Sequence, residues 1–238
     1  MSTTPFLVQR SAERYHGDHG WLSTYHSFSF ADYFDPSNLN WGALRVFNDD
    51  RVAAGKGFGT HPHRDMEIVT YVIDGELEHK DSMGNHGVVK PGGIQYLSAG
   101  TGIAHSEFNH SKDRPVHFVQ MWVLPHSPGL EPNYGQQQFE RQDRLNTWLA
   151  VASGQTGVVA PVTLLQDASM HVSRLEELET TYTFDAARFG FVFVAEGNVE
   201  INGEKLAAGD SVRVHGIGSL SARGTGELVL WDVPGVTT

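Results

Sequence analysis

The chain has 238 residues, of which 39% are hydrophobic and 11% aromatic, enough for the core of one large domain or two small ones. Its 17 basic and 28 acidic residues give a net charge of −11, which argues against nucleic acid or an anionic membrane as a direct partner. Cysteine is absent, which excludes disulfides, thiolate metal sites and cysteine nucleophiles. With no apolar leader and no long apolar run, a cytoplasmic protein is predicted.

Short β-branched and aromatic runs separated by glycine-rich turns predict a mainly β fold in the first half of the chain. The run over residues 68–73 precedes Asp74-Gly75, a dipeptide typical of a tight hairpin. Residues 88–110 predict three strands separated by a Pro-Gly-Gly turn and a glycine-rich turn. The almost wholly apolar segment VHFVQMWVLP predicts a strand buried within a barrel.

The second half repeats the pattern after a polar, turn-rich connection over residues 125–144, with a short helix predicted near residues 136–143. Helical turns are also predicted near Ser173. Residues 72–78 read VIDGELE and residues 194–200 read VAEGNVE, and glycine-containing turns follow both, which indicates a duplicated β-barrel. Two domains are therefore predicted, 1–135 and 136–238.

Thirteen histidines are the first sign of chemistry, and two short patterns stand out among them. His61 and His63 are two residues apart, as are His105 and Glu107. Chance yields roughly 0.7 H-x-H pairs in such a chain, so neither pattern decides anything alone. Residues two apart on a strand share a face, and neighbouring strands would bring three imidazoles and one carboxylate together. That set suits a divalent first-row metal with open coordination positions.

The second half offers no equivalent set. Aligning the two repeats places Thr183, Asp185 and Phe189 opposite His61, His63 and Glu67, and places Ala222 and Gly224 opposite His105 and Glu107. None of the five keeps the side chain of its counterpart, so the C-terminal domain is predicted to lack a metal.

Other histidines are predicted to have structural roles rather than to bind metal. His79, His86 and His110 lie in turn-like contexts and are predicted to be solvated. His117 alternates within an apolar strand and is predicted to be a hydrogen-bonded core histidine. His26 lies among aromatic residues in a cluster that favours the core over a substrate pocket.

The spacing Gly55-x5-His61-x-His63-x3-Glu67-x7-Gly75 resembles the first cupin motif, with one extra residue before the last glycine, and Gly102-x2-His105-x3-Asn109 resembles the end of the second. The segments HPHRDMEIVTYVIDGELEHKDSMGN, LSAGTGIAHSE, VQMWVLP and HSFSFADYFDP resemble the pirin family of cupins. The length and GLEPNYGQQQF resemble its bacterial members described as quercetin 2,3-dioxygenases. The resemblance covers most of residues 20–140 and implies an all-β bicupin of two antiparallel jelly-roll barrels.

The resemblance also implies a ligand set. His61, His63, His105 and Glu107 would hold one divalent transition metal, with iron as the first choice and nickel, copper, cobalt, manganese or zinc as alternatives. Glu67 competes with Glu107, because in many other cupins the glutamate of the first motif binds the metal, whereas in pirin-like proteins the position of Glu107 does so. Glu107 is also the candidate general base.

The implied activity is cleavage of a flavonol such as quercetin by O2, with release of carbon monoxide. Cavity walls would come from aromatic residues: Phe28, Phe30, Phe108, Phe118 and Trp122. The alternative is a redox-sensing regulatory protein that uses the same ligands and acts through a protein partner. A purely structural metal is disfavoured, because structural sites are closed and this ligand set leaves positions open. A monomer is predicted, since duplicated domains can bury each other's barrel faces.

Overall fold

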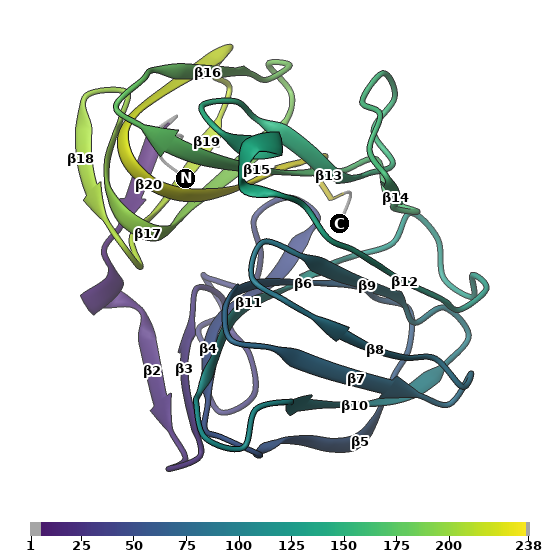
Figure 1. The fold of residues 1–238 in the computed structure, drawn as a ribbon. Helices are drawn as coiled ribbons and strands as arrows, with labels where there is room; N and C mark the ends of the chain where they lie inside the picture. The colour runs from purple at the N-terminus through teal and green to yellow at the C-terminus, as the bar shows by residue number, and fades with distance from the viewer. Residues whose placement is uncertain (1–5, 237–238) are drawn as a thin grey trace. The chain divides into compact units, whose positions relative to one another are not determined.

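The computed structural model describes residues 6–236, which form two compact units whose regular secondary structure is mainly β-strand (Figure 1). The N-terminal unit comprises Tyr15–Asn40 and Leu44–Phe139. The C-terminal unit comprises the described residues up to Arg14, Trp41–Ala43 and the described residues from Glu140 onward. The prediction of an all-β chain is confirmed. In the described part of the chain, no helix has the length and apolar character needed to cross a membrane.

Two sheets form the N-terminal unit. One has seven strands in the order β12-β9-β6-β11-β4-β3-β2, and the other has four in the order β5-β10-β7-β8, which lie side by side in Figure 1. In chain order the strands are β2 (Tyr15–Asp18), β3 (Leu22–His26), β4 (Leu44–Val52), β5 (Gly57–His63), β6 (Glu67–Asp74), β7 (Leu77–Asp81), β8 (His86–Val89), β9 (Ile94–Ser98), β10 (Ile103–Asn109), β11 (Val116–Val123) and β12 (Asn133–Gln137).

The apolar core of this unit includes two clusters at different levels of the seven-stranded sheet. The first cluster includes Leu22, Val52 and Phe118, and the second includes Ile68 and Leu97, with the partly buried Trp122 packed against it. The predicted buried strand is β11, which pairs with β4 on one side and β6 on the other. Its side chains contribute to both clusters, because alternate residues share one face and follow one another along the strand, from Phe118 in the first cluster to Trp122 beside the second.

The predicted hairpin at Asp74-Gly75 is wrong. β6 ends at Asp74 and β7 begins at Leu77, but β6 pairs with β9 and β11 whereas β7 pairs with β8 and β10. The turn therefore carries the chain from one sheet to the other. Gly75 has a φ of +79°, and a Cβ there would lie 2.8 Å from the carbonyl oxygen of Pro115, so the corner requires glycine.

One sheet forms the C-terminal unit, in the order β1-β19-β17-β20-β15-β13-β14, with β16 paired to β20 and β18 to β17. Its elements are β1 (Phe6–Gln9), η1 (Ser11–Glu13), η2 (Arg141–Arg144), β13 (Leu149–Ser153), β14 (Val162–Thr163), β15 (Ser169–Glu176), β16 (Thr180–Thr183), β17 (Phe189–Ile201), β18 (Glu204–Ala207), β19 (Ser211–His215) and β20 (Ser219–Val233). An apolar cluster that includes Leu175, Val192 and Leu230 lies within this unit.

Several local predictions change in this half. Ser173 lies in the extended strand β15, so the helical turns predicted there are wrong, because the strand is buried along nearly its whole length. The repeat at residues 194–200 lies within β17, and the hairpin follows it, between β17 and β18. β1 pairs with β19, with Phe6 opposite Val214, so the N-terminal segment belongs to the C-terminal unit. The ranges 1–135 and 136–238 stay a prediction about where independent domains begin and end.

Candidate metal centre

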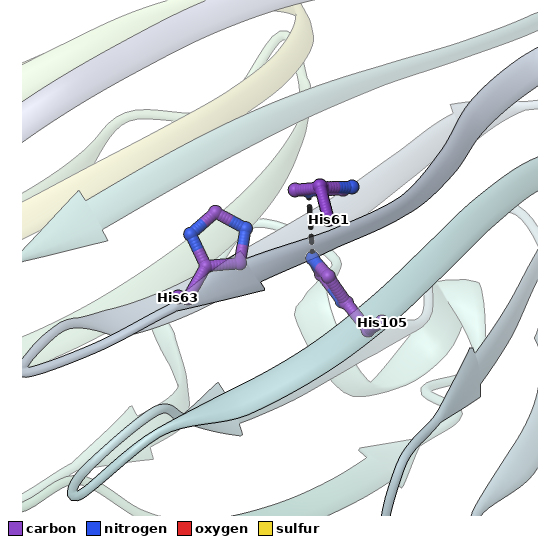
Figure 2. Close-up of side chains that lie close together, drawn as sticks. All are labelled: His61, His63 and His105. Carbon is purple, nitrogen blue, oxygen red and sulfur yellow. Dashed lines mark hydrogen bonds between the residues drawn. The ribbon is translucent and has the colours of Figure 1, made fainter.

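Two neighbouring strands carry the predicted metal ligands. β5 places His61 and His63 two residues apart on one face, and β10 runs antiparallel beside it with His105 directly opposite His61. Between His105 and Glu107 the register shifts by one residue, a β-bulge whose extra residue lies on β5. Figure 2 shows the rings from the two strands pointing toward one another.

The three imidazoles form a group of the size that one metal ion requires. Their ligand nitrogens all lie within 4.8 Å of one another, and the Nε2 atoms of His61 and His105 are 3.1 Å apart (Figure 2). Two nitrogens that each lie about 2.1 Å from one metal, at right angles, are about 3.0 Å apart. The spacing of His61 and His105 therefore fits two adjacent ligands of a single cation.

The protonation states of the group also suit metal binding. Nδ1 of His61 lies 2.8 Å from the carbonyl oxygen of Gly59, which can only accept, so in the neutral ring Nδ1 carries the proton and Nε2 presents a lone pair. Burial, reinforced by the neighbouring imidazoles, lowers the pKa of His63 to about 4 and that of His105 to about 3. Both rings are neutral at pH 7, the form in which histidine coordinates metals.

Glu107 lies beside the three histidines but outside their group. It is 1% exposed, and both carboxylate oxygens accept amide hydrogen bonds: Oε1 from Gln95, and Oε2 from Gln120 at 2.7 Å. Its negative charge partly offsets the lowering of the pKa of His63. The two amides hold the buried carboxylate in one orientation, and its role as fourth ligand stays a prediction.

Glu67, the rival ligand, has a different environment. Its carboxylate is fully buried at the start of β6 and accepts a hydrogen bond from the hydroxyl of Tyr96 at 3.0 Å. Glu67 is not among the residues that line the cavity next to His61 and His63, whereas Glu107 is.

That cavity has a volume of about 280 Å³ and lies within the N-terminal unit. It is lined by Tyr15, His19, Leu22, Thr24, His26, Phe30, Ala31, Asp32, Asn48, Asp50, Phe58, His61, His63, Glu107, Gln120 and Trp122. Of the lining residues, Trp122 packs edge-on against both His63 and Phe30, with ring centroids 4.9 and 5.2 Å away. His61 and His63 therefore face a partly aromatic, partly polar space.

The five predicted wall residues separate into two groups. Phe30 and Trp122 line the cavity, whereas the fully buried Phe28 and Phe118 and the exposed Phe108 do not. Tyr15 and Phe58 line it as well, although the sequence analysis did not select them. His26, predicted as a core residue, contributes to the cavity wall and packs against the rings of Tyr15 and Phe30.

His79 is fully buried behind His105, which contradicts the prediction that it is solvated. Its ring lies 5.2 Å from that of His105 and stacks on Tyr134 at 4.1 Å, and its Nε2 is 3.1 Å from the Oδ2 of Asp81. The alternation His79-x-Asp81 on β7 is the sequence signal that could have indicated this buried pair. His117, by contrast, is hydrogen-bonded to Asp49 at 2.7 Å, as predicted.

Comparison with known proteins places this architecture. A family model described as Pirin matches residues 8–123, and one described as Quercetinase C-terminal cupin domain matches residues 150–233. An Escherichia coli K12 protein named quercetin 2,3-dioxygenase is 39% identical over 240 residues, which cover 96% of this chain and 99% of its own. The chain belongs to the pirin family. A Caulobacter vibrioides pirin-like protein is 42% identical over 218 residues, covering 90% of this chain and 94% of its own.

A solved structure carries the same fold. Bacterial pirin YhhW of Escherichia coli in complex with nickel(II) is 38% identical, with a TM-score of 0.88, and the match covers 97% of this chain and 100% of that one. With two cupin-type family models along the chain, the predicted bicupin architecture of this pirin-family member is confirmed. The resemblance of the motifs around His61 and His105 to pirin is likewise confirmed.

Proposed function

We propose that the protein is a metal-dependent dioxygenase of the quercetinase type, which cleaves a flavonol with O2 and releases carbon monoxide. The observation that carries the proposal is the group of three histidines, of which His61 and His63 line a partly aromatic cavity. The near full-length relative named quercetin 2,3-dioxygenase supports the same activity.

The metal would be held by His61, His63, His105 and Glu107. The choice of Glu107 over Glu67 is supported by its place at the cavity, since Glu67 is turned toward Tyr96. The nickel(II) complex of YhhW supports a divalent transition metal, and iron stays the first choice among the candidates. When bound, such an ion would act as a Lewis acid and would bring a substrate oxygen and dioxygen close together.

The protein residues would bind, orient and deprotonate the substrate. The flat rings of a flavonol would pack against Phe30 and Trp122, which places the 3-hydroxyl oxygen beside the histidines. The carboxylate of Glu107 would accept the 3-hydroxyl proton, and its two amide donors would keep it in place during the transfer.

The overall reaction balances without another oxidant or reductant. The flavonol loses carbon 3 of its heterocycle as carbon monoxide, and the heterocycle opens. The product is an ester that joins the carboxyl group of one aromatic acid to a phenolic hydroxyl of another, and it contains both atoms of O2. The proton taken by Glu107 returns to the opened product, so the carboxylate is regenerated.

The test is carbon monoxide release from quercetin under oxygen, with protein reconstituted separately with each candidate metal. The proposal predicts release that is lost in His61→Ala and Glu107→Gln and retained in His86→Ala, a substitution of a histidine on the exposed face of β8. Absence of release from every fully loaded form would refute the dioxygenase.

That negative outcome would favour the alternative, a redox-sensing regulator that acts through a protein partner. A partner recovered with one oxidation state of bound iron, and not with the other, would support this alternative. The predicted monomer and cytoplasmic location are separate proposals, and size-exclusion chromatography and cell fractionation test them.

A further inference from the structure

The inner face of the seven-stranded sheet carries a row of polar side chains. Strand register places them side by side across β3, β4, β11, β6 and β9, in the order His26, Asn48, Gln120, Thr70 and Gln95. By register the row lies between the two apolar clusters of the unit. Polar groups this deep in a barrel cost free energy unless they have hydrogen-bond partners, so each one needs an explanation.

The half of the row next to Glu107 is explained by that carboxylate. Gln95 and Gln120 donate to its two oxygens, and their amide nitrogens lie 3.4 and 3.5 Å from the hydroxyl of Thr70. These three side chains therefore form one hydrogen-bonded network with Glu107.

Asn48, in the other half of the row, is not explained by Glu107. The Oδ1 atom of Asn48 is buried without a hydrogen-bond partner among the described residues, and so is the Oγ1 atom of Thr24 on the adjacent strand. Both residues are only 4% exposed. Thr24 lies directly opposite Asp50, which is two residues from Asn48 along β4 and shares its face.

Thr24, Asn48 and Asp50 all line the cavity that His61, His63 and Glu107 line. A carboxylate only accepts hydrogen bonds, whereas an amide and a hydroxyl can accept or donate. This combination suits a ligand hydroxyl, which donates one hydrogen bond and accepts others. At about 280 Å³, the cavity is small enough that a flat aromatic ligand would bring its ring substituents to this wall.

We propose that Thr24, Asn48 and Asp50 form a second subsite that binds a hydroxyl of the substrate other than the one held at the histidines. The substrate class is then a polyhydroxylated aromatic compound, and the subsite determines the preference for it. This inference rests on the proposed function in one respect, that an oxygen of the same molecule lies at the histidines.

The test compares quercetin with 3-hydroxyflavone, which keeps the 3-hydroxyl and lacks the other hydroxyls. Dissociation constants are measured by quenching of tryptophan fluorescence, and kcat/KM by carbon monoxide release, on metal-reconstituted protein. We expect the wild type to bind quercetin at least ~10-fold more tightly than 3-hydroxyflavone. A site that hydrogen-bonds a ligand hydroxyl leaves its own polar groups unpaired when the ligand lacks that hydroxyl. Asn48→Leu and Thr24→Val should each reduce this ratio several-fold and leave the affinity for 3-hydroxyflavone within about twofold.

Thr163→Val serves as the matched control, because Thr163 is exposed on β14, and Asp50→Asn tests the third member. Because Asn48→Leu could fail to fold, Thr24→Val, which differs by one hydroxyl, carries the test independently. A ratio unchanged in both variants, or no quercetin binding by the wild type, would overturn the subsite. A binding ratio that falls in the variants while no form releases carbon monoxide would support the subsite and refute the dioxygenase.

Discussion

Replacing Gln95 with methionine tests whether the amide donors of Glu107 position it for metal binding. Gln95 is 3% exposed and does not line the cavity, so the substitution alters neither the surface nor the substrate wall. Methionine has a similar volume and shape, which limits any packing effect. The variant removes the hydrogen bond to Oε1 of Glu107 and the longer one, at 3.4 Å, to the hydroxyl of Thr70, and it leaves the buried carboxylate with Gln120 alone of its two amide donors.

The magnitude follows from the charge on the acceptor. A hydrogen bond to a charged group contributes about 1.5–3 kcal/mol, so the metal-free variant should lose stability of that order in urea unfolding. If the amide also orients a metal ligand, metal affinity should fall about 10- to 100-fold, the usual effect of removing a ligand's hydrogen-bond partner.

The assay is competition for the metal with a chelator of known affinity at pH 7, for wild type and variant. Gln136→Met provides the control, because Gln136 lies directly opposite Gln95 in the β12–β9 register but is exposed. Metal affinity within about twofold of wild type, in a folded variant, would refute the positioning of Glu107 by Gln95.

Three further predictions concern stability and metal loading. Burial lowers the pKa of His171 to about 4, so the stability that its neutral ring contributes is present above about pH 6.5 and is lost as the pH falls toward 4. In urea unfolding, the wild type should therefore lose about 2 kcal/mol more stability between pH 7 and pH 5 than His171→Gln does. An unchanged pH dependence in the variant would contradict this. A Cβ on Gly57 would lie 2.2 Å from the carbonyl oxygen of Glu107, so Gly57→Ala should lower the free energy of unfolding by about 1–3 kcal/mol and weaken metal binding. Gly59→Ala, whose Cβ would have no heavy atom within 4 Å, should change neither quantity when the two variants are compared by thermal melting and metal titration. Metal at about 100 times its dissociation constant should stabilise the protein by about 2.7 kcal/mol, which is measured as a higher melting temperature. A chelator should reverse the rise, and His61→Ala should not show it. An equal rise in His61→Ala would mean that the metal binds elsewhere.

The sequence predicted strands wherever local signals were sufficient. Residues 88–110 gave β8, β9 and β10, because glycine-rich turns separate β-branched runs there. The turn at Asp74-Gly75 was also located, but its dipeptide signal describes only the bend. Which strands pair on either side depends on the two sheets, and so the predicted hairpin became a change of sheet.

The candidate site was predictable to a similar depth. Alternation on a strand was enough to pair His61 with His63 and His105 with Glu107, and the family resemblance indicated that the two pairs share one metal. The amide donors Gln95 and Gln120 could not be found in this way, because they come from strands whose register with one another only the folded sheet defines.

The pairing of β1 with β19 has a consequence for biosynthesis. Val214 follows its partner Phe6 by 208 residues (214 − 6), and at about 5–20 residues per second some 10–40 seconds of synthesis separate the two. Until the two strands meet, β19 presents an open edge that could pair with another chain. The sheet of the C-terminal unit therefore cannot be completed until β19 has been synthesised, and a deletion of β1 would expose a sheet edge more than two hundred residues away in the sequence.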